Sequence, residues 1–91
     1  MAKGVISWKR QGPQGERFEI YAHHVGNQWE FYIRQRRLDQ WHPLARPPLE
    51  DWLELLDGIR RRVARRLLRP QEIQRAEQLI RDRFPEAEWE T

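Results

Sequence analysis

The sequence predicts an α+β fold, an antiparallel sheet of three to four strands followed by two helices packed on one face of the sheet. Apolar residues alternate with polar ones between positions 5 and 36, as in half-buried strands, and from position 48 they recur with the period of an amphipathic helix. The chain of 91 residues is long enough for one hydrophobic core. We therefore expect a single domain over residues 1–85 and an acidic tail over residues 86–91.

A first strand is expected over Val5 to Arg10, because Ile6 and Trp8 fall on the same side of an extended chain. The segment 11–15 that follows is rich in glycine and contains a proline, which is typical of a turn. This turn connects the first strand to the next one.

The clearest local signal is a hairpin over residues 17–36. Its centre is Gly26-Asn27, a dipeptide that suits a two-residue turn because glycine tolerates a positive φ. Counting outward from the turn pairs Glu19 with Arg34 and Tyr21 with Tyr32. A shift of the strand pairing by one residue would expose the apolar side chains to water, so the register of the hairpin is well specified. The apolar face consists of Phe18, Ile20, Ala22, His24, Trp29, Phe31 and Ile33.

A short fourth strand is expected within residues 38–44, where it would carry Trp41. Pro43 has no amide hydrogen for a strand ladder, which places this strand at an edge of the sheet.

Two helices complete the expected fold. The first begins at Pro48, runs for about six turns and stops before Pro70, because proline lacks an amide hydrogen and clashes with the preceding turn. The second runs from Pro70 to Phe84 and is ended by Pro85. The tail beyond it carries Trp89, which could dock back.

Each expected helix has one apolar face. Three apolar residues lie outside these faces, namely Leu55, Leu68 and Leu79. One small sheet covers a limited area, so these residues would be better buried against a second subunit. We therefore expect a homodimer, the commonest symmetric assembly.

The composition excludes several classes of protein. The chain has no cysteine, which removes disulfides, thiolate catalysis and thiolate metal sites. No apolar run approaches the roughly 18 residues of a membrane helix, and residues 1–9 lack the apolar core of a signal peptide. We expect a cytoplasmic protein that contacts no membrane.

Catalytic chemistry has few residues to use. An oxygen nucleophile would have to be Ser7, the only serine, which lies in an expected strand without a visible partner. His23 and His24 are adjacent in a strand and point to opposite faces, so they cannot chelate a metal together. No glycine-rich phosphate loop occurs. We expect no catalytic residues, no metal and no small-molecule cofactor. The alternative is an enzyme that uses His23, Glu30 and Tyr32 as acid–base groups. We expect their face of the hairpin to be open to solvent, whereas catalytic groups usually lie in a sheltered cleft.

The first group of residues suited to binding lies on the polar face of the hairpin. Its members are Arg17, Tyr21, Tyr32, Arg34 and Arg36. Aromatic rings stack on bases and guanidinium groups hold phosphates, which is how open sheets grip single-stranded nucleic acid. The alternative is an ordinary solvent face, with Glu19 and Glu30 offsetting the charge, or a face covered by a partner subunit.

The second group is the basic end of the first helix, where six arginines and no acid occur between positions 60 and 69. The arginines placed on the solvent side are Arg61, Arg65 and Arg69. They could neutralise several phosphates without reading sequence. The alternative is a solvated helix end whose charges are paired with Asp57 and with acids of the second helix.

The order of elements resembles a known class of proteins. Antiparallel strands lead into a helix that begins Pro48-Leu49-Glu50-Asp51-Trp52 and continues with Leu53, Leu56 and Ile59. Over residues 4–68 this is similar to the Whirly proteins and the transcriptional positive cofactor four, which are single-stranded-DNA-binding domains of four strands and a helix. The resemblance implies that helices mediate dimerisation and that the sheet holds the DNA, through Tyr21, Tyr32, Arg34 and Arg36. The short fourth strand, the second helix and the acidic tail depart from that pattern.

Together these observations predict a non-enzymatic domain that binds nucleic acid, single-stranded in preference to duplex. The alternative is a protein-interaction or adaptor module that uses the helix pair, or the acidic tail with Trp89, and binds no nucleic acid.

Overall fold

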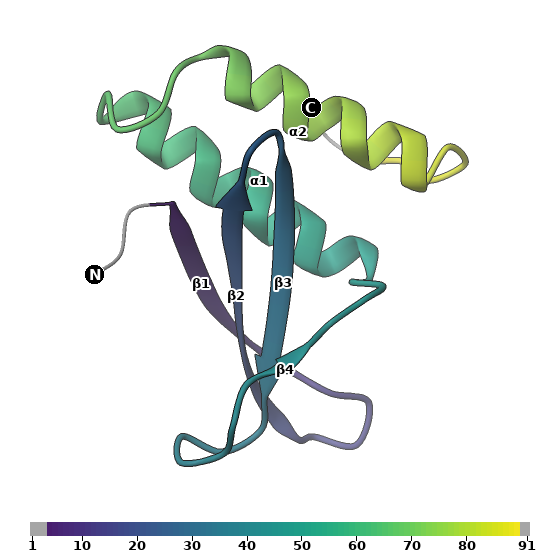
Figure 1. Cartoon of the computed structure of the whole chain (residues 1–91). Coiled ribbons are helices and arrows are strands. Elements are labelled where there is room, and N and C mark those ends of the chain that lie inside the picture. The colour runs from purple at the N-terminus through teal and green to yellow at the C-terminus, as the bar shows by residue number, and fades with distance from the viewer. Residues whose placement is uncertain (1–3, 90–91) are drawn as a thin grey trace. The chain divides into compact units, whose positions relative to one another are not determined.

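The structure, a computed structural model, describes residues 4–89 and contains a four-stranded antiparallel sheet followed by two helices (Figure 1). It consists of two compact units, a sheet unit that ends at Pro47 and a helical unit that begins at Pro48. The predicted α+β class and the order of its elements are confirmed. The single domain over residues 1–85 stays a prediction.

The strands of the sheet pair in the order of the sequence. They are β1 (Val5–Gln11), β2 (Arg17–Val25), β3 (Gln28–Arg34) and β4 (His42–Pro43). The predicted hairpin register is confirmed along β2 and β3, with Tyr21 opposite Tyr32 and Glu19 opposite Arg34. Gly26 has a φ of 61° in the two-residue turn between these strands, a conformation that glycine adopts without steric cost.

The alternation of side chains gives the sheet two different faces. The inner face carries the buried residues Ile6, Trp8, Ile20, Ala22 and Phe31. The rings of Trp8 and Phe31 meet edge to face there, with centroids 6.0 Å apart. The outer face carries exposed or half-buried residues, among them Ser7, Lys9, Arg17, Glu19, Tyr21, His23, Glu30, Tyr32 and Arg34.

The predicted apolar face is buried only at its centre. Ile20, Ala22 and Phe31 are buried, whereas the remaining members Phe18, His24, Trp29 and Ile33 are half-buried. The rings of His24 and Trp29 stack on each other with centroids 4.4 Å apart and planes 8° from parallel. His24 therefore lies at the edge of the core, as its position opposite Trp29 predicted.

The fourth strand is shorter than residues 38–44. β4 lies at the edge of the sheet, as predicted, but contains only two residues, and Trp41 comes just before it. Strand β3 ends at Arg34, so the prediction that Arg36 lies on a strand face was wrong. Residues 36–39 instead form a turn in which the Asp39 carboxylate accepts a hydrogen bond from the Arg36 amide over 3.0 Å. Short polar side chains compete with strand pairing in this way.

The helical unit is a pair of helices that run in opposite directions, α1 (Leu49–Ala64) and α2 (Gln71–Arg83) (Figure 1). The buried apolar residues of this unit are Trp52, Leu55, Leu56, Ile59, Ala76 and Ile80. An ion pair of 3.2 Å between Arg60 and Glu77 joins the two helices. The predicted boundaries of the second helix are confirmed to within one residue at each end.

Helix α1 ends at Ala64, several residues earlier than predicted. Arg66 has a φ of 61°, and the amides of Arg66 and Leu67 donate to the carbonyls of Val63 and Arg62 over 2.9 and 2.8 Å. This is the Schellman arrangement, which satisfies the last carbonyls of a helix and stops it. The position usually holds glycine, so the sequence carried no signal for a stop here. Consequently Arg65 and Arg69 lie in the connection between the helices.

The apolar surplus that suggested a second subunit is smaller than expected. Leu55 is fully buried within a single chain, and Leu68 and Leu79 are half-buried. The large apolar side chains that stay exposed are Val25, Leu38 and Leu67. The homodimer stays a prediction. Among residues 4–89, no helix is long and apolar enough to cross a membrane.

Candidate functional site

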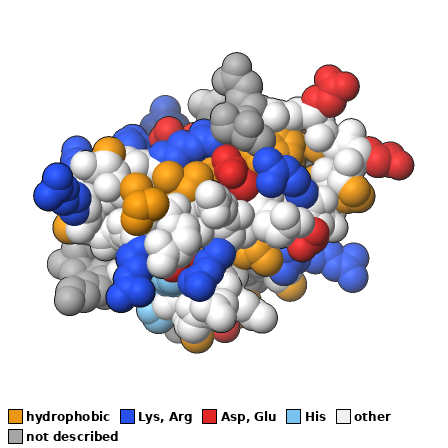
Figure 2. Space-filling model, turned by 90° about the horizontal axis from the view of Figure 1, so that it is seen from above, with side chains coloured by type: hydrophobic (Ala, Val, Ile, Leu, Met, Phe, Trp, Pro, Cys, Tyr) orange, Lys and Arg blue, Asp and Glu red, His pale blue; other side chains and the backbone are white. Residues whose placement is uncertain are grey.

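On the face drawn in Figure 2, positive charge alone does not locate a binding site. On the face drawn in Figure 2, Lys and Arg side chains are separated by hydrophobic, acidic and other side chains. The formal net charge of +3 results from 17 basic and 14 acidic residues. The site therefore has to be found from local geometry, and the outer face of the sheet offers the clearest arrangement.

Tyr21 and Tyr32 stack on each other at the centre of the outer face. Their ring centroids lie 4.9 Å apart and their planes are 17° from parallel, because the two residues are cross-strand partners. The negative charge of Glu30 raises the pKa of the Tyr32 hydroxyl, and burial and the neighbouring Tyr21 act in the same direction. The Tyr32 hydroxyl donates a weak hydrogen bond of 3.4 Å to the Glu30 carboxylate. Each tyrosine thus already has one ring face covered by the other.

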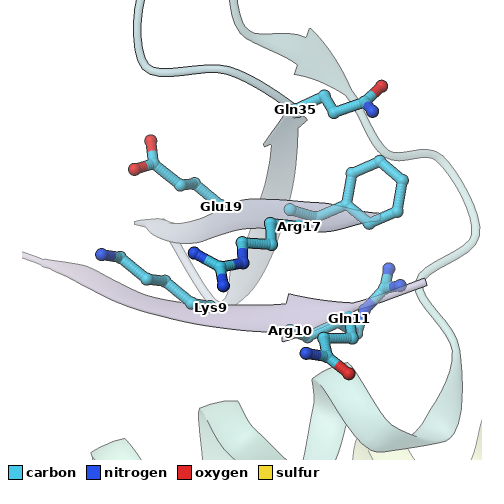
Figure 3. A pocket seen from close by; sticks show the side chains of 7 residues that line it. Lys9, Arg10, Gln11, Arg17, Glu19 and Gln35 are labelled. Atoms are coloured by element: carbon cyan, nitrogen blue, oxygen red, sulfur yellow. The ribbon is translucent and has the colours of Figure 1, made fainter. Parts of the chain in front are cut away.

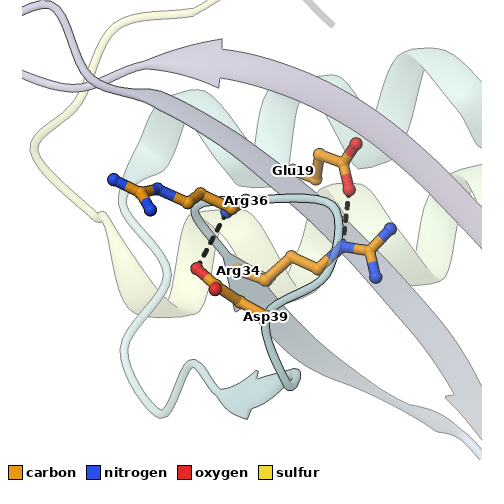
Figure 4. A network of polar contacts seen from close by, with 4 residues as sticks. All are labelled: Glu19, Arg34, Arg36 and Asp39. Atoms are coloured by element: carbon orange, nitrogen blue, oxygen red, sulfur yellow. Dashed lines mark hydrogen bonds and ion pairs between the residues drawn. The ribbon is translucent and has the colours of Figure 1, made fainter.

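Trp41 is the third aromatic residue of this face, and two contacts hold it. Its ring meets Tyr21 edge to face, with centroids 4.7 Å apart and planes 89° from parallel. The guanidinium of Arg34 lies 4.3 Å from the centroid of the Trp41 ring. Arg34 in turn forms an ion pair with Glu19 (Figure 4). The indole therefore has a defined position although it precedes the short strand β4.

A hollow of about 370 Å³ lies beside Trp41. We call it the aromatic hollow, and its lining consists of Ser7, Trp8, Lys9, Glu19, Ile20, Arg34 and Trp41. Neither Tyr21 nor Tyr32 lines it. The hollow thus combines the side of an indole ring with one ammonium group, one guanidinium group and one carboxylate.

A second hollow of about 530 Å³ lies where strands β1 and β2 approach their connecting loop. We call it the basic hollow, and its lining consists of Lys9, Arg10, Gln11, Arg17, Phe18, Glu19 and Gln35. Figure 3 shows the side chains of Lys9 and Arg17 extending toward the same side from the neighbouring strands. Three cations and two amide groups give this hollow several hydrogen-bond donors for an anion.

The two hollows adjoin each other, because Lys9 and Glu19 line both of them. The positive groups in the combined lining are Lys9, Arg10, Arg17 and Arg34, against the single carboxylate of Glu19. Arg10 alternates to the inner face, where its guanidinium lies over the Phe18 ring. On the outer face, Lys9, Arg17 and Arg34 against Glu19 leave a local charge of +2 beside the Trp41 ring. Such a site can take an anionic ligand that also offers a planar ring.

The basic end of α1 is a separate and smaller feature. A hollow of about 190 Å³ there is lined by Arg61, Arg62, Arg65 and Leu67. Arg61 is already paired with Asp57 over 3.0 Å, one turn earlier in the helix. Arg69 does not line this hollow. Arg61 and Arg65 thus line a common hollow.

The residues that the sequence selected divide into three groups. Arg17 and Arg34 line the combined hollows, Tyr21 and Tyr32 lie beside Trp41, and Arg36 lies in the turn after β3. Sequence reasoning missed Lys9 and Trp41 as site residues. The alternation along β1 could have placed Lys9 on the outer face. No pattern in the sequence indicated the contact between Trp41 and Tyr21, because this contact depends on the backbone path of residues 35–41.

The acid–base alternative gains no sheltered site. Glu30 is exposed and contacts Tyr32 only through the weak hydrogen bond described above. His23 lies opposite Glu30 across the strands and is half-buried. Within residues 4–89, no group of three or more histidine and carboxylate side chains could hold a metal ion.

Trp89 docks back on the helical unit, as its position in the tail allowed. The guanidinium of Arg81 lies 5.6 Å from the centroid of the Trp89 ring, and Trp89 is half-buried. The predicted acidic tail extends to residue 91, and its last two residues lie outside the described part of the chain.

Comparisons of this chain with protein-family models, with curated proteins and with solved structures found no match. The resemblance to the Whirly proteins and the positive cofactor four therefore stays a prediction.

Proposed function

We propose that this chain binds single-stranded nucleic acid on the outer face of its sheet. A base lies in the aromatic hollow against the part of the Trp41 ring that Arg34 leaves open, and backbone phosphates lie near Lys9 and Arg17 in the basic hollow. The observation that carries this proposal is the junction of the two hollows, one lined by the Trp41 indole and the other by the outer-face cations Lys9 and Arg17, with Lys9 in common.

The chemistry of the site favours a single strand over a duplex. A base can lie against Trp41 only when its own π-face is accessible, and in a duplex neighbouring bases cover that face. Base–aromatic stacking contributes about 1–3 kcal/mol per base and tolerates any sequence. The cations add a sequence-independent attraction that weakens with salt. We therefore expect little sequence preference.

Glu19 has a defined place in this site. Its carboxylate pairs with Arg34, which in turn lies over Trp41. The ion pair holds the guanidinium beside the indole, and it offsets one of the positive charges. A nucleic-acid phosphate that approaches Arg34 would compete with Glu19, so the tightest phosphate contacts are assigned to Lys9 and Arg17.

The test is the binding of a labelled single-stranded oligonucleotide, followed by fluorescence anisotropy at low and moderate salt. Trp41→Ala should weaken binding by about 5- to 150-fold, the equivalent of one stacked base. Trp89→Ala is the matched control, because that tryptophan also lies beneath an arginine but belongs to the helical unit. It should leave the affinity unchanged.

The phosphate contacts are tested by the salt dependence. The double variant Lys9→Gln, Arg17→Gln should reduce the slope of log affinity against log salt by about 1.4, since each phosphate contact to a single strand contributes about 0.7. Arg46→Gln, a charge loss at an exposed loop residue of the same unit, should leave the slope unchanged. Absence of binding at low salt would refute the proposal and leave the protein-interaction module. Equal effects of Trp41→Ala and Trp89→Ala would remove the assigned site.

A further inference from the structure

The turn over residues 36–39 presents a leucine to solvent. Leu38 is 97 % exposed, more than the other exposed large hydrophobic residues, Leu67 at 67 % and Val25 at 45 %. The turn is closed by two reciprocal hydrogen bonds. The Asp39 amide donates to the Arg36 carbonyl over 2.9 Å. The Arg36 amide donates to the Asp39 carboxylate over 3.0 Å, and Figure 4 shows this second bond. The two bonds hold the backbone that carries Leu38, and its side chain stays in solvent.

Both ends of this loop are attached to the candidate site. On one side the loop follows Arg34, and on the other it leads to Trp41, and these two residues contact each other. An extended chain spans at most about 3.6 Å per residue, so Leu38 lies within about 11 Å of Trp41. Stacked bases follow one another at about 3.4 Å along a strand. Leu38 is therefore within about three bases of a base that lies against Trp41.

Two arginines and one carboxylate flank the exposed leucine, which leaves a net positive charge in the turn. Arg36 and Arg37 are both exposed and precede it directly, and the carboxylate of Asp39 is engaged by the Arg36 amide. Insertion of Leu38 into an apolar pocket of another protein would remove water from these guanidinium groups, which is costly. Phosphates on both sides of an inserted leucine would instead neutralise them. The charges thus favour nucleic acid as the partner of this turn.

We propose that Leu38 is a wedge that enters the stack of bases at a junction where a single strand leaves a duplex. Leucine is one of the apolar side chains that proteins insert between base steps, with nearby cations on the phosphates. The single strand lies on the outer face as proposed above, and the wedge contacts the last base pair of the duplex. This inference rests on the proposed function and narrows its ligand to junctions of single and double strands.

The test compares two probes, a single-stranded oligonucleotide and a forked duplex that carries the same single strand. The fork contains 2-aminopurine in its last base pair, because the fluorescence of this base increases when it is unstacked. The unmodified protein should bind the fork more tightly than the single strand and should increase the 2-aminopurine signal. Leu38→Ala should lower the affinity for the fork by about 10- to 150-fold, the range for burial of a leucine side chain, and should abolish the signal.

Three controls make the result specific. Leu67→Ala removes another exposed leucine and should leave both probes unaffected. Leu38→Phe should keep fork binding, because phenylalanine also serves as a wedge. Leu38→Ala should leave the affinity for the single strand unchanged. The high exposure of Leu38 leaves folding unaffected by its substitution, and circular dichroism checks this.

Each remaining outcome is decisive. Suppose that Leu38→Ala binds the fork as tightly as the unmodified protein, while Trp41→Ala loses its affinity for the single-stranded probe. Then Leu38 does not act as a wedge, and the proposed function stands. If Leu38→Ala weakens both probes equally, Leu38 contacts the strand in general and is not a wedge. If the unmodified protein binds neither probe, both proposals are wrong.

Discussion

The ring of Phe18 occupies the space that a side chain at Gly12 would need. A Cβ atom at Gly12 would lie 2.6 Å from Cε2 of Phe18 and 2.8 Å from a carboxylate oxygen of Glu16. Gly12 also closes the loop between β1 and β2, since its amide donates to the Glu16 carbonyl over 2.8 Å. The glycine at position 12 therefore leaves room for the Phe18 ring, which lines the basic hollow.

Gly12→Ala should therefore destabilise the protein by about 1–3 kcal/mol, the usual cost of inserting a methyl group into occupied space. Denaturant unfolding measures this difference. Gln14→Ala, in the same loop, should change the stability by less than about 0.5 kcal/mol, because the side chain of Gln14 is exposed. Equal stability of Gly12→Ala and the unmodified protein would show that Phe18 moves freely aside.

The end of α1 offers a substitution that should stabilise the fold. Arg66 has a φ of 61°, which costs a residue with a side chain about 1–2 kcal/mol and glycine almost nothing. Arg66→Gly should therefore raise the free energy of unfolding by about 0.5–1 kcal/mol, after allowance for the larger backbone entropy of unfolded glycine. Thermal or denaturant unfolding measures it.

Arg65→Gly is the matched control for that change. Arg65 has a φ of −92° and needs no glycine, so this substitution should lower the stability. A lower stability of Arg66→Gly as well would show that the arginine side chain contributes more than its backbone strain costs.

The titration of Tyr32 should depend on Glu30. The carboxylate of Glu30 raises the pKa of the Tyr32 hydroxyl above its ordinary value of 10.0, because the phenolate would be repelled. Glu30→Gln should therefore lower this pKa. The absorbance of the phenolate measures it, and Tyr21→Phe in both proteins leaves Tyr32 as the only tyrosine that titrates.

The sign of the related stability change follows from the same shift. A pKa that is higher in the folded than in the unfolded protein stabilises the fold below the unfolded value, and this contribution is lost as the pH rises through the folded pKa. The contribution of Tyr32 should thus disappear at alkaline pH above about 10. An unchanged titration in Glu30→Gln would show that Glu30 is not the cause.

The basic end of α1 has its own test in nucleic-acid binding. If Arg61 and Arg65 hold phosphates, the double variant Arg61→Gln, Arg65→Gln should reduce the salt slope of single-strand binding by about 1.4. Arg75→Gln, together with Arg83→Gln, removes the same charge from exposed positions of α2 and is the control. Equal slopes in all three proteins would confine the phosphate contacts to the sheet unit.

The hairpin was predictable because its determinants are local. Gly26-Asn27 admits the positive φ of a two-residue turn, and the alternation on both sides allows only one register that buries Ile20 and Phe31. The second helix was predictable for a similar reason, since Pro70 and Pro85 bound it on both sides. In each case a few adjacent residues decide the backbone conformation.

The candidate site was predictable only in part. Alternation along the strands placed Tyr21, Tyr32 and Arg34 on one face, and the structure confirms their common side. Whether their rings and charges border a hollow depends on residues from other segments. The contacts of Trp41 with Tyr21 and Arg34 are such a case, because no pattern in the sequence near Trp41 indicates which residues its side chain contacts.

The class of fold, the register of β2 on β3 and the span of α2 followed from the sequence, because turn chemistry and side-chain periodicity act over a few neighbouring residues. The end of α1 at Ala64 and the position of Trp41, against Tyr21 and beneath Arg34, became known from the folded chain alone. Both have one cause. Hydrogen bonds at the end of α1 hold Arg66 in its left-handed backbone conformation. Contacts with Tyr21 of β2 and Arg34 of β3 hold the Trp41 ring. Both sets of contacts form only when the chain has folded.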